Sequence, residues 1–401
     1  MYLTRLSLTN YRIFSRLELD FPRRVVLFTG QNAQGKTSIL EAVGYLANFS
    51  SFSAANDRQL MNFNTPSEPI MVARLLGEFH REGRQHSIEV RLIQDAASSP
   101  STPRFSKQVL LDGVKKRVSE VYGQFNAVTF LPQMSRVIEG TPADRRQYFD
   151  EILSQVEPGY SRHLSAYSKA LTQRNALLKT LAEAGGNRNQ LEPWDELLAR
   201  HGAAIMRARI LALAALEKQA IPIHQQLTRD LEILQFHYQP SYEPLKKPAG
   251  QLALRLQTNL DRTGISSDEL ERGLLAALKQ NSHADIQRGQ TTIGPHRDEV
   301  RFLSNQVDLG DFGSRGQTRT ALLSLKFAEV GWMKQRTGEW PVLLLDEIMA
   351  ELDPQRRKDL LGVVGQVEQA FLTATDLDMF PSDFVRDHEV WQVSQGIVTR
   401  P

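Results

Sequence analysis

A glycine-containing loop that ends in lysine and threonine is the segment with the clearest chemistry. It spans residues 30–37 and follows the apolar run Val25–Thr29. Where a strand leads through such a loop into a helix, backbone N–H groups converge on one space and form an anion site. Glycines let the backbone approach a phosphate, the lysine reaches the β- and γ-phosphates, and the hydroxyl ligates Mg²⁺. We therefore predict that ATP and Mg²⁺ bind here, through Gly30, Gln31, Asn32, Ala33, Gln34, Gly35, Lys36 and Thr37.

Two acids end a second apolar run, Val342–Leu345. If this run is a strand that ends beside the loop, Asp346 can hold Mg²⁺, usually through water. Glu347 is then placed to polarise the attacking water as a general base. On this interpretation Lys36 and Glu347 are the catalytic residues. The alternative is a core strand whose two acids merely face solvent.

Two further segments could complete such a site. Ser314, Gly316 and Gln317 precede a helical apolar stripe, and a hydroxyl with a glycine at a helix start forms another anion site. By itself this pattern also fits an ordinary capped helix. Gln133 is a candidate for contact with the metal and its water, and a polar loop residue is an equally open interpretation. The metal ligands expected from the sequence are Thr37, Asp346 and Gln133.

The composition is that of an ordinary globular protein. The chain has 401 residues, of which 41% are apolar and 23% charged, with a net charge of +2. It has no cysteine, which excludes disulfides, thiolate metal sites and a cysteine nucleophile. We expect a cytoplasmic protein, because no signal core opens the chain and no apolar run approaches the roughly 20 residues that span a bilayer.

The order of the patterns predicts an α/β fold with an inserted lobe. Strand patterns fill the first part of the chain, including alternating residues from about 71 to 111 and a polar loop at 95–103. From Thr141, a helix start followed by proline, the chain is mostly helical in pattern to about residue 280. The predicted division is 1–120 and 287–401 for an ATPase head built from both chain ends, and 121–286 for a mainly helical lobe.

The motif order, with Asp353 following the acids, is that of ATP-binding-cassette (ABC) type ATPases. Over nearly the whole chain the sequence resembles the RecF family of recombination mediators. Two of the strings below, Gln173–Asn175 and Gly294–Asp298, are not general ATPase motifs and make the resemblance specific. Besides the motifs above, it rests on Leu8–Arg12, Gly140–Arg146, Phe149, Asp150, Leu171–Asn175, Trp194, Asp195, Gly294–Asp298 and Gly313–Gln317.

The resemblance implies an ABC-type head related to SMC ATPases, with a helical lobe in place of long coiled coils. It implies that ATP is held between two heads of a homodimer, with Ser314, Gly316, Gln317 and Asp353 of one protomer facing the nucleotide on Lys36 of the other. It further implies DNA binding, to duplex, gapped or single-stranded DNA, and a DNA-dependent ATPase that works as a switch. The expected role is repair and replication at gaps, with RecO-like and RecR-like partners that help load a recombinase.

The sequence departs from related ATPases at three positions. Ala33 stands where related loops often carry glycine, and Arg315 where transporter ATPases carry glycine. The segment Ala370–Asp376 has no histidine where many ABC ATPases place a γ-phosphate switch, and Thr375 or Asp376 could substitute. Slow hydrolysis would fit that absence.

Several basic residues are candidates for DNA contact, although charge clusters are more often solvated faces. Arg145, Arg146 and Arg174 could instead pair with Asp144, Asp150 and Glu151, and His296 is expected to be structural. The other candidates are Arg5, Arg12, Arg16, Arg23, Arg24, Lys107, Lys115, Lys116 and Arg117.

Other functions stay open alongside this one. A nucleotide-switched scaffold without significant hydrolysis, or another SMC-like head ATPase, would share most of the motifs. A transporter ATPase subunit is disfavoured by the missing histidine, the long insertion and the lack of a membrane segment.

Overall fold

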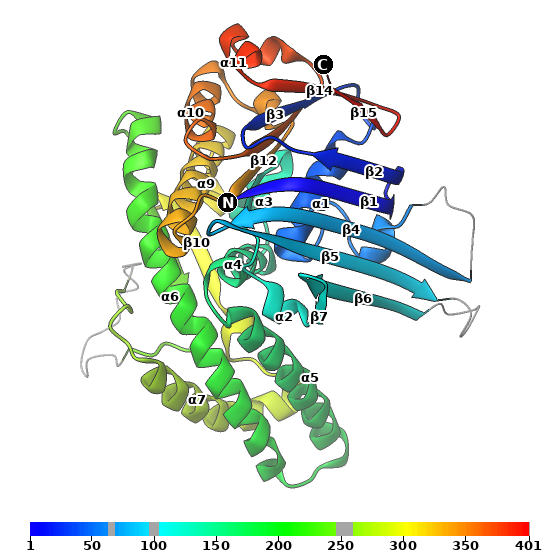
Figure 1. Ribbon diagram of the computed structural model, residues 1–401. Helices are drawn as coiled ribbons and strands as arrows, with labels where there is room; N and C mark the ends of the chain where they lie inside the picture. Colours follow the sequence, from blue (N-terminus) through cyan, green and yellow to red (C-terminus); the bar gives the residue numbers. More distant parts are fainter. Residues whose placement is uncertain (63–68, 96–103, 246–259, 401) are drawn as a thin grey trace. The chain divides into compact units, whose positions relative to one another are not determined.

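The computed structural model describes residues 1–62, 69–95, 104–245 and 260–400 (Figure 1). The predicted loop at 95–103 lies outside the described residues except for Asp95. The chain forms two compact units. Unit 1 joins the two chain ends, Met1–Met134 and Glu329–Pro401, and unit 2 is Ser135–Ala328.

The first sheet of unit 1 is antiparallel and has six strands. Its strands alternate in burial, as in β5, where Ile88, Val90 and Leu92 point into the core. This confirms the strands predicted for the first part of the chain. In spatial order they are β2 (Phe14–Asp20), β1 (Tyr2–Tyr11), β4 (Ile70–Arg81), β5 (Arg84–Asp95), β6 (Arg104–Leu111) and β7 (Val114–Lys116).

The second sheet of unit 1 is parallel apart from one edge hairpin, and its central strands are apolar on both faces. It brings the two chain ends together, because the strand before the glycine loop and the strand before Asp346 flank the same neighbour, β13. The predicted α/β head is therefore confirmed. The spatial order is β15 (Ile397–Thr399), β14 (Glu389–Ser394), β3 (Val25–Thr29), β13 (Ala370–Ala374), β12 (Val342–Asp346) and β8 (Ala127–Phe130).

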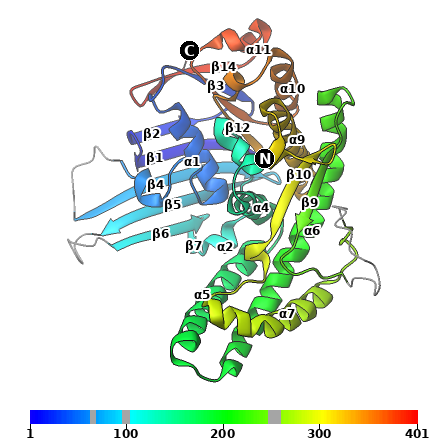
Figure 2. The ribbon, with the colours of Figure 1, turned by 180° about the vertical axis from the view of Figure 1, so that it is seen from behind.

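Helix α1 (Lys36–Asn48) follows the glycine loop and contacts strands of both sheets (Figure 2). Ile39, Leu40 and Val43 are fully buried, as their helical spacing predicts. The remaining helices of unit 1 are short. They are α2 (Val118–Val121), α10 (Pro354–Val364), α11 (Ser382–Asp387) and the 3₁₀ turns Asp57–Leu60, Pro132–Ser135, Ile348–Glu351 and Leu377–Met379.

Unit 2 combines long helices with a three-stranded sheet. Its helix α4 begins as predicted, because the Thr141 hydroxyl accepts a hydrogen bond from the backbone N–H of Asp144 and a proline follows at the first helical position. The helices are α3 (Arg136–Glu139), α4 (Pro142–Val156), α5 (Tyr160–Ala184), α6 (Glu192–Thr228), α7 (Ser267–Arg288), α8 (Leu309–Phe312), the first part of α9 (Arg315–Thr337), and the 3₁₀ turns Arg188–Leu191 and Pro295–Arg297.

The three strands of unit 2 are β11 (Val307–Asp308), β10 (Glu299–Ser304) and β9 (Leu234–Gln239). The mainly helical interpretation of this region missed β9. Its alternation of buried Leu234, Phe236 and Tyr238 is the signal that could have found it. The boundaries of the two units fall at 134/135 and 328/329, and the division into head and lobe at 120/121 and 286/287 stays a prediction.

Candidate functional site

The glycine loop connects β3 to α1 in the geometry that phosphate binding requires. Gly30 has φ 147°, and a Cβ there would lie 2.2 Å from the carbonyl oxygen of Val393. Gly35 has φ 110° and caps α1, with the Ile13 side chain 2.7 Å from its ideal Cβ position. Both glycines are therefore required by the fold as well as by the approach of a ligand. Ala33 has φ 64°, a left-handed conformation that glycine adopts more readily than alanine.

The Lys36 ammonium is folded back onto its own loop. Its Nζ donates to the carbonyl oxygen of Gly30 at 2.6 Å and to that of Gln31 at 3.0 Å, and it lies 3.2 Å from Glu347 Oε1. The side chain is only 3% exposed, so these partners stabilise a buried charge. Neutral carbonyls are weaker acceptors than phosphate oxygens, and a bound polyphosphate can therefore replace them.

The two acids at the end of β12 lie beside this lysine, as the sequence predicted. Asp346 Oδ1 accepts hydrogen bonds from the Thr37 hydroxyl at 2.9 Å and from the Thr373 hydroxyl at 2.8 Å. The Thr373 hydroxyl in turn accepts from the backbone N–H of Glu347 at 2.9 Å. Burial raises the pKa of Asp346 above its usual range, and the two hydroxyls act against that rise. Thr373 was not among the predicted site residues.

These groups fit both ATP and Mg²⁺. A threonine hydroxyl and an aspartate oxygen in contact are hard oxygen donors, the type that Mg²⁺ prefers, and two protein ligands suffice where phosphates and water supply the others. Within the part of the chain that the structure describes, no cluster of three or more metal-ligating side chains competes as a metal site. The loop leads directly into the N-terminus of α1, where backbone N–H groups suit a phosphate.

A polar cavity of about 600 Å³ opens beside the first residues of the loop. Thr375 and Asp376, the two candidates for the missing switch histidine, are among its lining residues, together with Gly30 and Gln31. Asp376 Oδ1 also accepts from the backbone N–H of Asp378, which caps the following 3₁₀ turn. The role of either residue at a γ-phosphate stays a prediction.

The C-terminal hairpin braces the loop, which the sequence did not indicate. Between β14 and β15, the backbone N–H of Gln395 donates to Gln34 Oε1 at 2.6 Å and that of Gly396 to the Gln34 carbonyl at 3.2 Å. Gln133 is exposed and follows β8, whose Phe130 pairs with Leu345 of β12. Pairing of parallel strands thus brings Gln133 to the edge of the sheet that carries Asp346.

In unit 2, Ser314, Gly316 and Gln317 lie at the start of α9, where Ser314 and Gly316 are exposed and Gln317 is half-buried. The Ser314 hydroxyl accepts from the backbone N–H of Gln317 at 3.2 Å, and Gln317 Oε1 accepts from the backbone N–H of Ser314 at 3.1 Å. This reciprocal cap confirms the capped helix start. A Cβ on Gly316 would meet nothing closer than the Ser314 Oγ at 3.9 Å, so the chain's own packing does not require glycine there.

Asp353, in unit 1, caps another helix. Its Oδ1 accepts from the backbone N–H of Arg356 at the start of α10. This hydrogen bond lowers the pKa of Asp353, and the nearby Arg356 side chain lowers it further. A contact between Asp353 and a second protomer stays a prediction.

The N-terminal arginines are already paired with carboxylates. Arg12 donates to the buried Glu41, which also accepts from Tyr11, Ser51 and Ser53. Lys107 donates to the Phe49 carbonyl beneath the sheet and pairs with Asp57, whereas Lys115 and Lys116 are exposed on β7. The other ion pairs are Arg5 and Arg16 with Glu18, Arg23 with Glu368, and Arg24 with Glu389.

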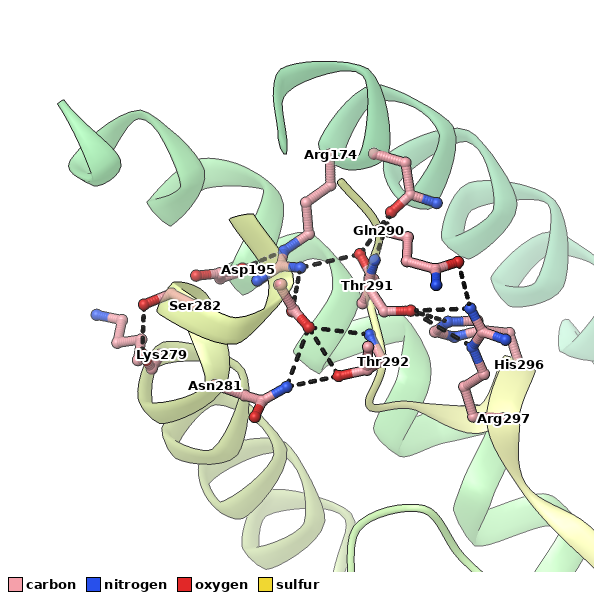
Figure 3. Close-up of polar contacts among 12 residues, drawn as sticks. Arg174, Asp195, Lys279, Asn281, Ser282, Gln290, Thr291, Thr292, His296 and Arg297 are labelled. Atoms are coloured by element: carbon pink, nitrogen blue, oxygen red, sulfur yellow. Dashed lines mark hydrogen bonds and ion pairs between the residues drawn. The ribbon is translucent and has the colours of Figure 1, made fainter. Parts of the chain in front are cut away.

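The acids that pair with the arginines of unit 2 are not those that the sequence suggested. Arg174 on α5 is 0% exposed and donates to Asp195 of α6 and Asp285 of α7, each at 2.7 Å, and to the Thr291 hydroxyl (Figure 3). Arg145 instead pairs with Glu299, and Arg146 donates to the Asp298 carbonyl. The expected partners Asp144, Asp150 and Glu151 are thus replaced, and a fully buried Arg174 has no surface for a DNA phosphate.

The segment Gly294–Asp298 connects this network to the rest of unit 2. The Tyr167 hydroxyl lies 2.7 Å from His296 Nδ1. On the other side of the ring, His296 Nε2 lies 3.1 Å from the Thr291 carbonyl (Figure 3). A neutral imidazole satisfies both contacts, and burial lowers the pKa of His296 to about 4. Asp298 is buried and accepts from the Tyr238 hydroxyl and the backbone N–H of Ser241. These contacts agree with the structural role expected for His296.

The described helices include none that is long and apolar enough to cross a membrane. Comparison with known proteins gives one consistent match. Residues 2–397 fit the family model described as RecF/RecN/SMC N terminal domain. The chain is 37% identical to the DNA replication and repair protein RecF of Chloroflexus aurantiacus and 36% identical to that of Herpetosiphon aurantiacus, in each case over 99% of both chains.

Solved structures give the same match. A structure of the recombination mediator protein RecF with ATP in the RecFOR pathway aligns over 100% of this chain and 97% of its own, with TM-score 0.83 and 29% identity. An SMC head bound to the C-winged helix domain of ScpA aligns with TM-score 0.51 and 15% identity, which supports the fold alone.

Proposed function

This chain belongs to the RecF family, and from that premise we propose that it is an ATP-dependent DNA-binding switch. ATP is held between two copies, by the glycine loop of one (residues 30–37, the P-loop) and by Ser314 and Gly316 of the other. Binding closes a homodimer on DNA, and slow hydrolysis, stimulated by DNA, opens it. The setting is cytoplasmic repair and replication at gaps, where RecO-like and RecR-like partners and a recombinase act with it.

The observation that carries this proposal is the exposed helix start at Ser314. Glycine in the first turn of α9 has no packing reason within the chain, since a Cβ there would meet only the Ser314 Oγ, at an ordinary contact distance of 3.9 Å. Glycine stabilises a helix less than alanine does, by about 1 kcal/mol, so its presence here indicates a functional reason. The close approach of a group from outside the chain supplies one. An exposed hydroxyl and a helix N-terminus beside it suit a phosphate.

The chemistry of the P-loop side follows from the contacts in unit 1. Mg²⁺–ATP, when bound, supplies the phosphoryl group and the Lewis acid. Lys36 exchanges the carbonyls of Gly30 and Gln31 for phosphate oxygens, and Thr37 and Asp346 supply the metal's protein ligands. Glu347 is 35% exposed, so water reaches the carboxylate that accepts its proton.

DNA binding is supported by the family and by a smaller set of residues than the sequence suggested. Arg174 is buried, whereas Lys115 and Lys116 of β7 and the following Arg117 are exposed candidates. The N-terminal arginines Arg16, Arg23 and Arg24 are paired with carboxylates yet remain exposed, so they stay candidates as well. The RecFOR name of the solved relative is the support for RecO-like and RecR-like partners.

ATP hydrolysis measured against protein concentration, with and without duplex DNA, tests the proposal. We expect the activity per protein to rise with concentration, because the site is shared, and to rise further with DNA. Activity that is independent of both would contradict the shared site, and absence of ATP binding would contradict the proposal altogether.

A further inference from the structure

A single carboxylate, Glu232, ties the start of α9 to the end of α6. It lies in the turn between α6 and β9 and is flanked by two exposed apolar residues, Leu231 and Ile233. Glu232 Oε1 accepts a hydrogen bond from Gln317 Nε2 at 3.2 Å. Its other oxygen accepts from the Ser304 hydroxyl at 2.8 Å. Glu232 is therefore held from β10 while it holds the amide of Gln317.

This contact fixes which way the Gln317 amide faces. A carboxylate accepts and cannot donate, so Nε2 of Gln317 must face Glu232. Oε1 must then face the backbone N–H of Ser314, from which it accepts at 3.1 Å. Without Glu232 the amide could turn over and present N–H groups to the N–H of Ser314, which would break the cap.

The orientation of the Gln317 amide determines what the Ser314 hydroxyl can do. Its oxygen accepts from the backbone N–H of Gln317 at 3.2 Å, so its hydrogen is free to donate outward. Gln317 has both ends of its side chain in use within its own protomer. Gln317 therefore holds Ser314 from within its own protomer.

A buried histidine of α6 lies beside this carboxylate. His224 Nε2 lies 3.4 Å from Glu232 Oε2, and His224 Nδ1 lies 3.1 Å from the Ser324 hydroxyl of α9. Burial lowers the pKa of His224, so this imidazole is neutral at pH 7. The Ser324 hydroxyl donates to the Thr320 carbonyl, so it accepts from His224 Nδ1. The unprotonated Nε2 makes no hydrogen bond to Glu232. The contact between His224 and Ser324 joins the last turns of α6 to α9.

We infer that Glu232 is a positioning residue for the ATP-bridged dimer, and that it acts through Gln317 to present Ser314 to the second protomer's nucleotide. The inference rests on the proposed function, because it assumes that Ser314 meets ATP held by another copy. It predicts a specific loss in dimer closure with no loss in the ATP affinity of the single protomer.

The test uses the full chain with Mg²⁺ and the slowly hydrolysed analogue ATPγS. Sedimentation gives the dimer dissociation constant, and a fluorescent ATP analogue at low protein concentration gives the affinity of the monomer. We expect Glu232→Ala to weaken the dimer about tenfold, the scale of one hydrogen bond to a charged group, with unchanged monomer affinity. Glu232→Gln keeps an acceptor and should weaken it much less.

Exchanging the acid and the amide between positions 232 and 317 distinguishes a positioning role of Glu232 from a general effect on stability. Gln317→Glu alone places two carboxylates together and should weaken the dimer as Glu232→Ala does. Glu232→Gln combined with Gln317→Glu restores one donor and one acceptor, and we expect it to recover most of the dimer affinity. Glu217→Ala is the matched control, because Glu217 also joins α6 to β9, through the backbone N–H of Phe236, without reaching Gln317.

The outcomes distinguish the two proposals. If the wild-type chain stays monomeric with ATPγS, the shared-site function is wrong and this inference is wrong with it. If the wild type dimerises while Glu232→Ala dimerises equally well, or while the exchanged pair shows no recovery over Gln317→Glu, the role of Glu232 is wrong and the shared site stands.

Discussion

The P-loop site and the Arg174 network each combine one buried cation with two acids, yet they differ in what surrounds the charges. Lys36 is tied to backbone carbonyls, and its neighbour Glu347 is 35% exposed. Arg174 is bound by Asp195 and Asp285, none of which reaches solvent appreciably. The first set can exchange its partners for a ligand. The second has no access and no replaceable acceptor, so it is structural. Two similar sets of charged residues therefore differ in role, and solvent access decides whether a set can bind a ligand or only stabilises the fold.

The largest effect is expected at the P-loop site, which we call the open site because its lysine can exchange its partners for a ligand. Lys36→Ala should lower ATP affinity by about a hundredfold or more, because charge-assisted hydrogen bonds contribute about 1.5–3 kcal/mol each. The urea midpoint should change little, since the carbonyls of Gly30 and Gln31 can be hydrated. Calorimetric titration with ATP checks the affinity, with exposed Lys115→Ala as control. Retained binding in Lys36→Ala would show that the site does not depend on this cation.

The chemical step of the open site depends on Glu347. Glu347→Gln should slow hydrolysis by about 10²- to 10⁴-fold, the usual contribution of a general base, and leave ATP affinity near that of the wild type. Single-turnover hydrolysis measures the rate. Unchanged turnover would favour a nucleotide-switched scaffold in which this carboxylate has no catalytic role.

The Arg174 network, which is closed to solvent, should respond in the opposite way: its loss should lower stability and leave ATP affinity unchanged. Arg174→Met leaves two buried carboxylates without a cation, and we expect the free energy of unfolding to fall by about 3–5 kcal/mol. ATP affinity should stay unchanged in the protein that remains folded. Urea unfolding gives the first quantity, with the exposed Arg16→Met, expected to cost under about 1 kcal/mol, as control. A loss no larger than that of Arg16→Met would remove the contrast between the two regions.

The last prediction concerns the pH dependence of stability at His296, which lies beside the Arg174 network. His296 has a folded pKa of about 4, below its ordinary value of 6.5, so the unfolded chain binds more protons between these values. Stability should therefore fall as pH drops from 6.5 to 4, by up to about 1.4 kcal/mol per unit from this residue. In His296→Gln that part of the slope should be absent. Equal slopes in urea unfolding for both proteins would contradict a neutral, buried His296.

The sequence predicted the open site better than the closed one for a physical reason. Phosphate chemistry restricts residue types within one short loop, so Gly30, Lys36 and Thr37 could be assigned their positions directly. Asp346 and Glu347 needed only the expectation that parallel strands end at one edge. The partners of Arg174 come from two other helices, α6 and α7. Both helices had to be placed in space before any pairing could be inferred.

Other misses have the same origin. β9 interrupts a mostly helical region, and its short alternation was outweighed by the helical patterns around it. The brace of Gln34 by the C-terminal hairpin joins residues more than three hundred positions apart, as does the buried pairing of Leu3 with Gln369. Such contacts depend on the fold that the parallel sheet creates from both chain ends.

The shared nucleotide site is tested most directly by mixing two inactive variants. Lys36→Ala removes the P-loop cation, and Ser314→Arg blocks the start of α9 while leaving ATP binding to the monomer intact. Each variant alone should neither dimerise with ATP nor hydrolyse it. In a mixture, the intact P-loop of the Ser314→Arg protomer can meet the intact Ser314 of the Lys36→Ala protomer. We predict that ATP-dependent dimers and hydrolysis reappear in the mixture, and a mixture as inactive as its components would contradict the account.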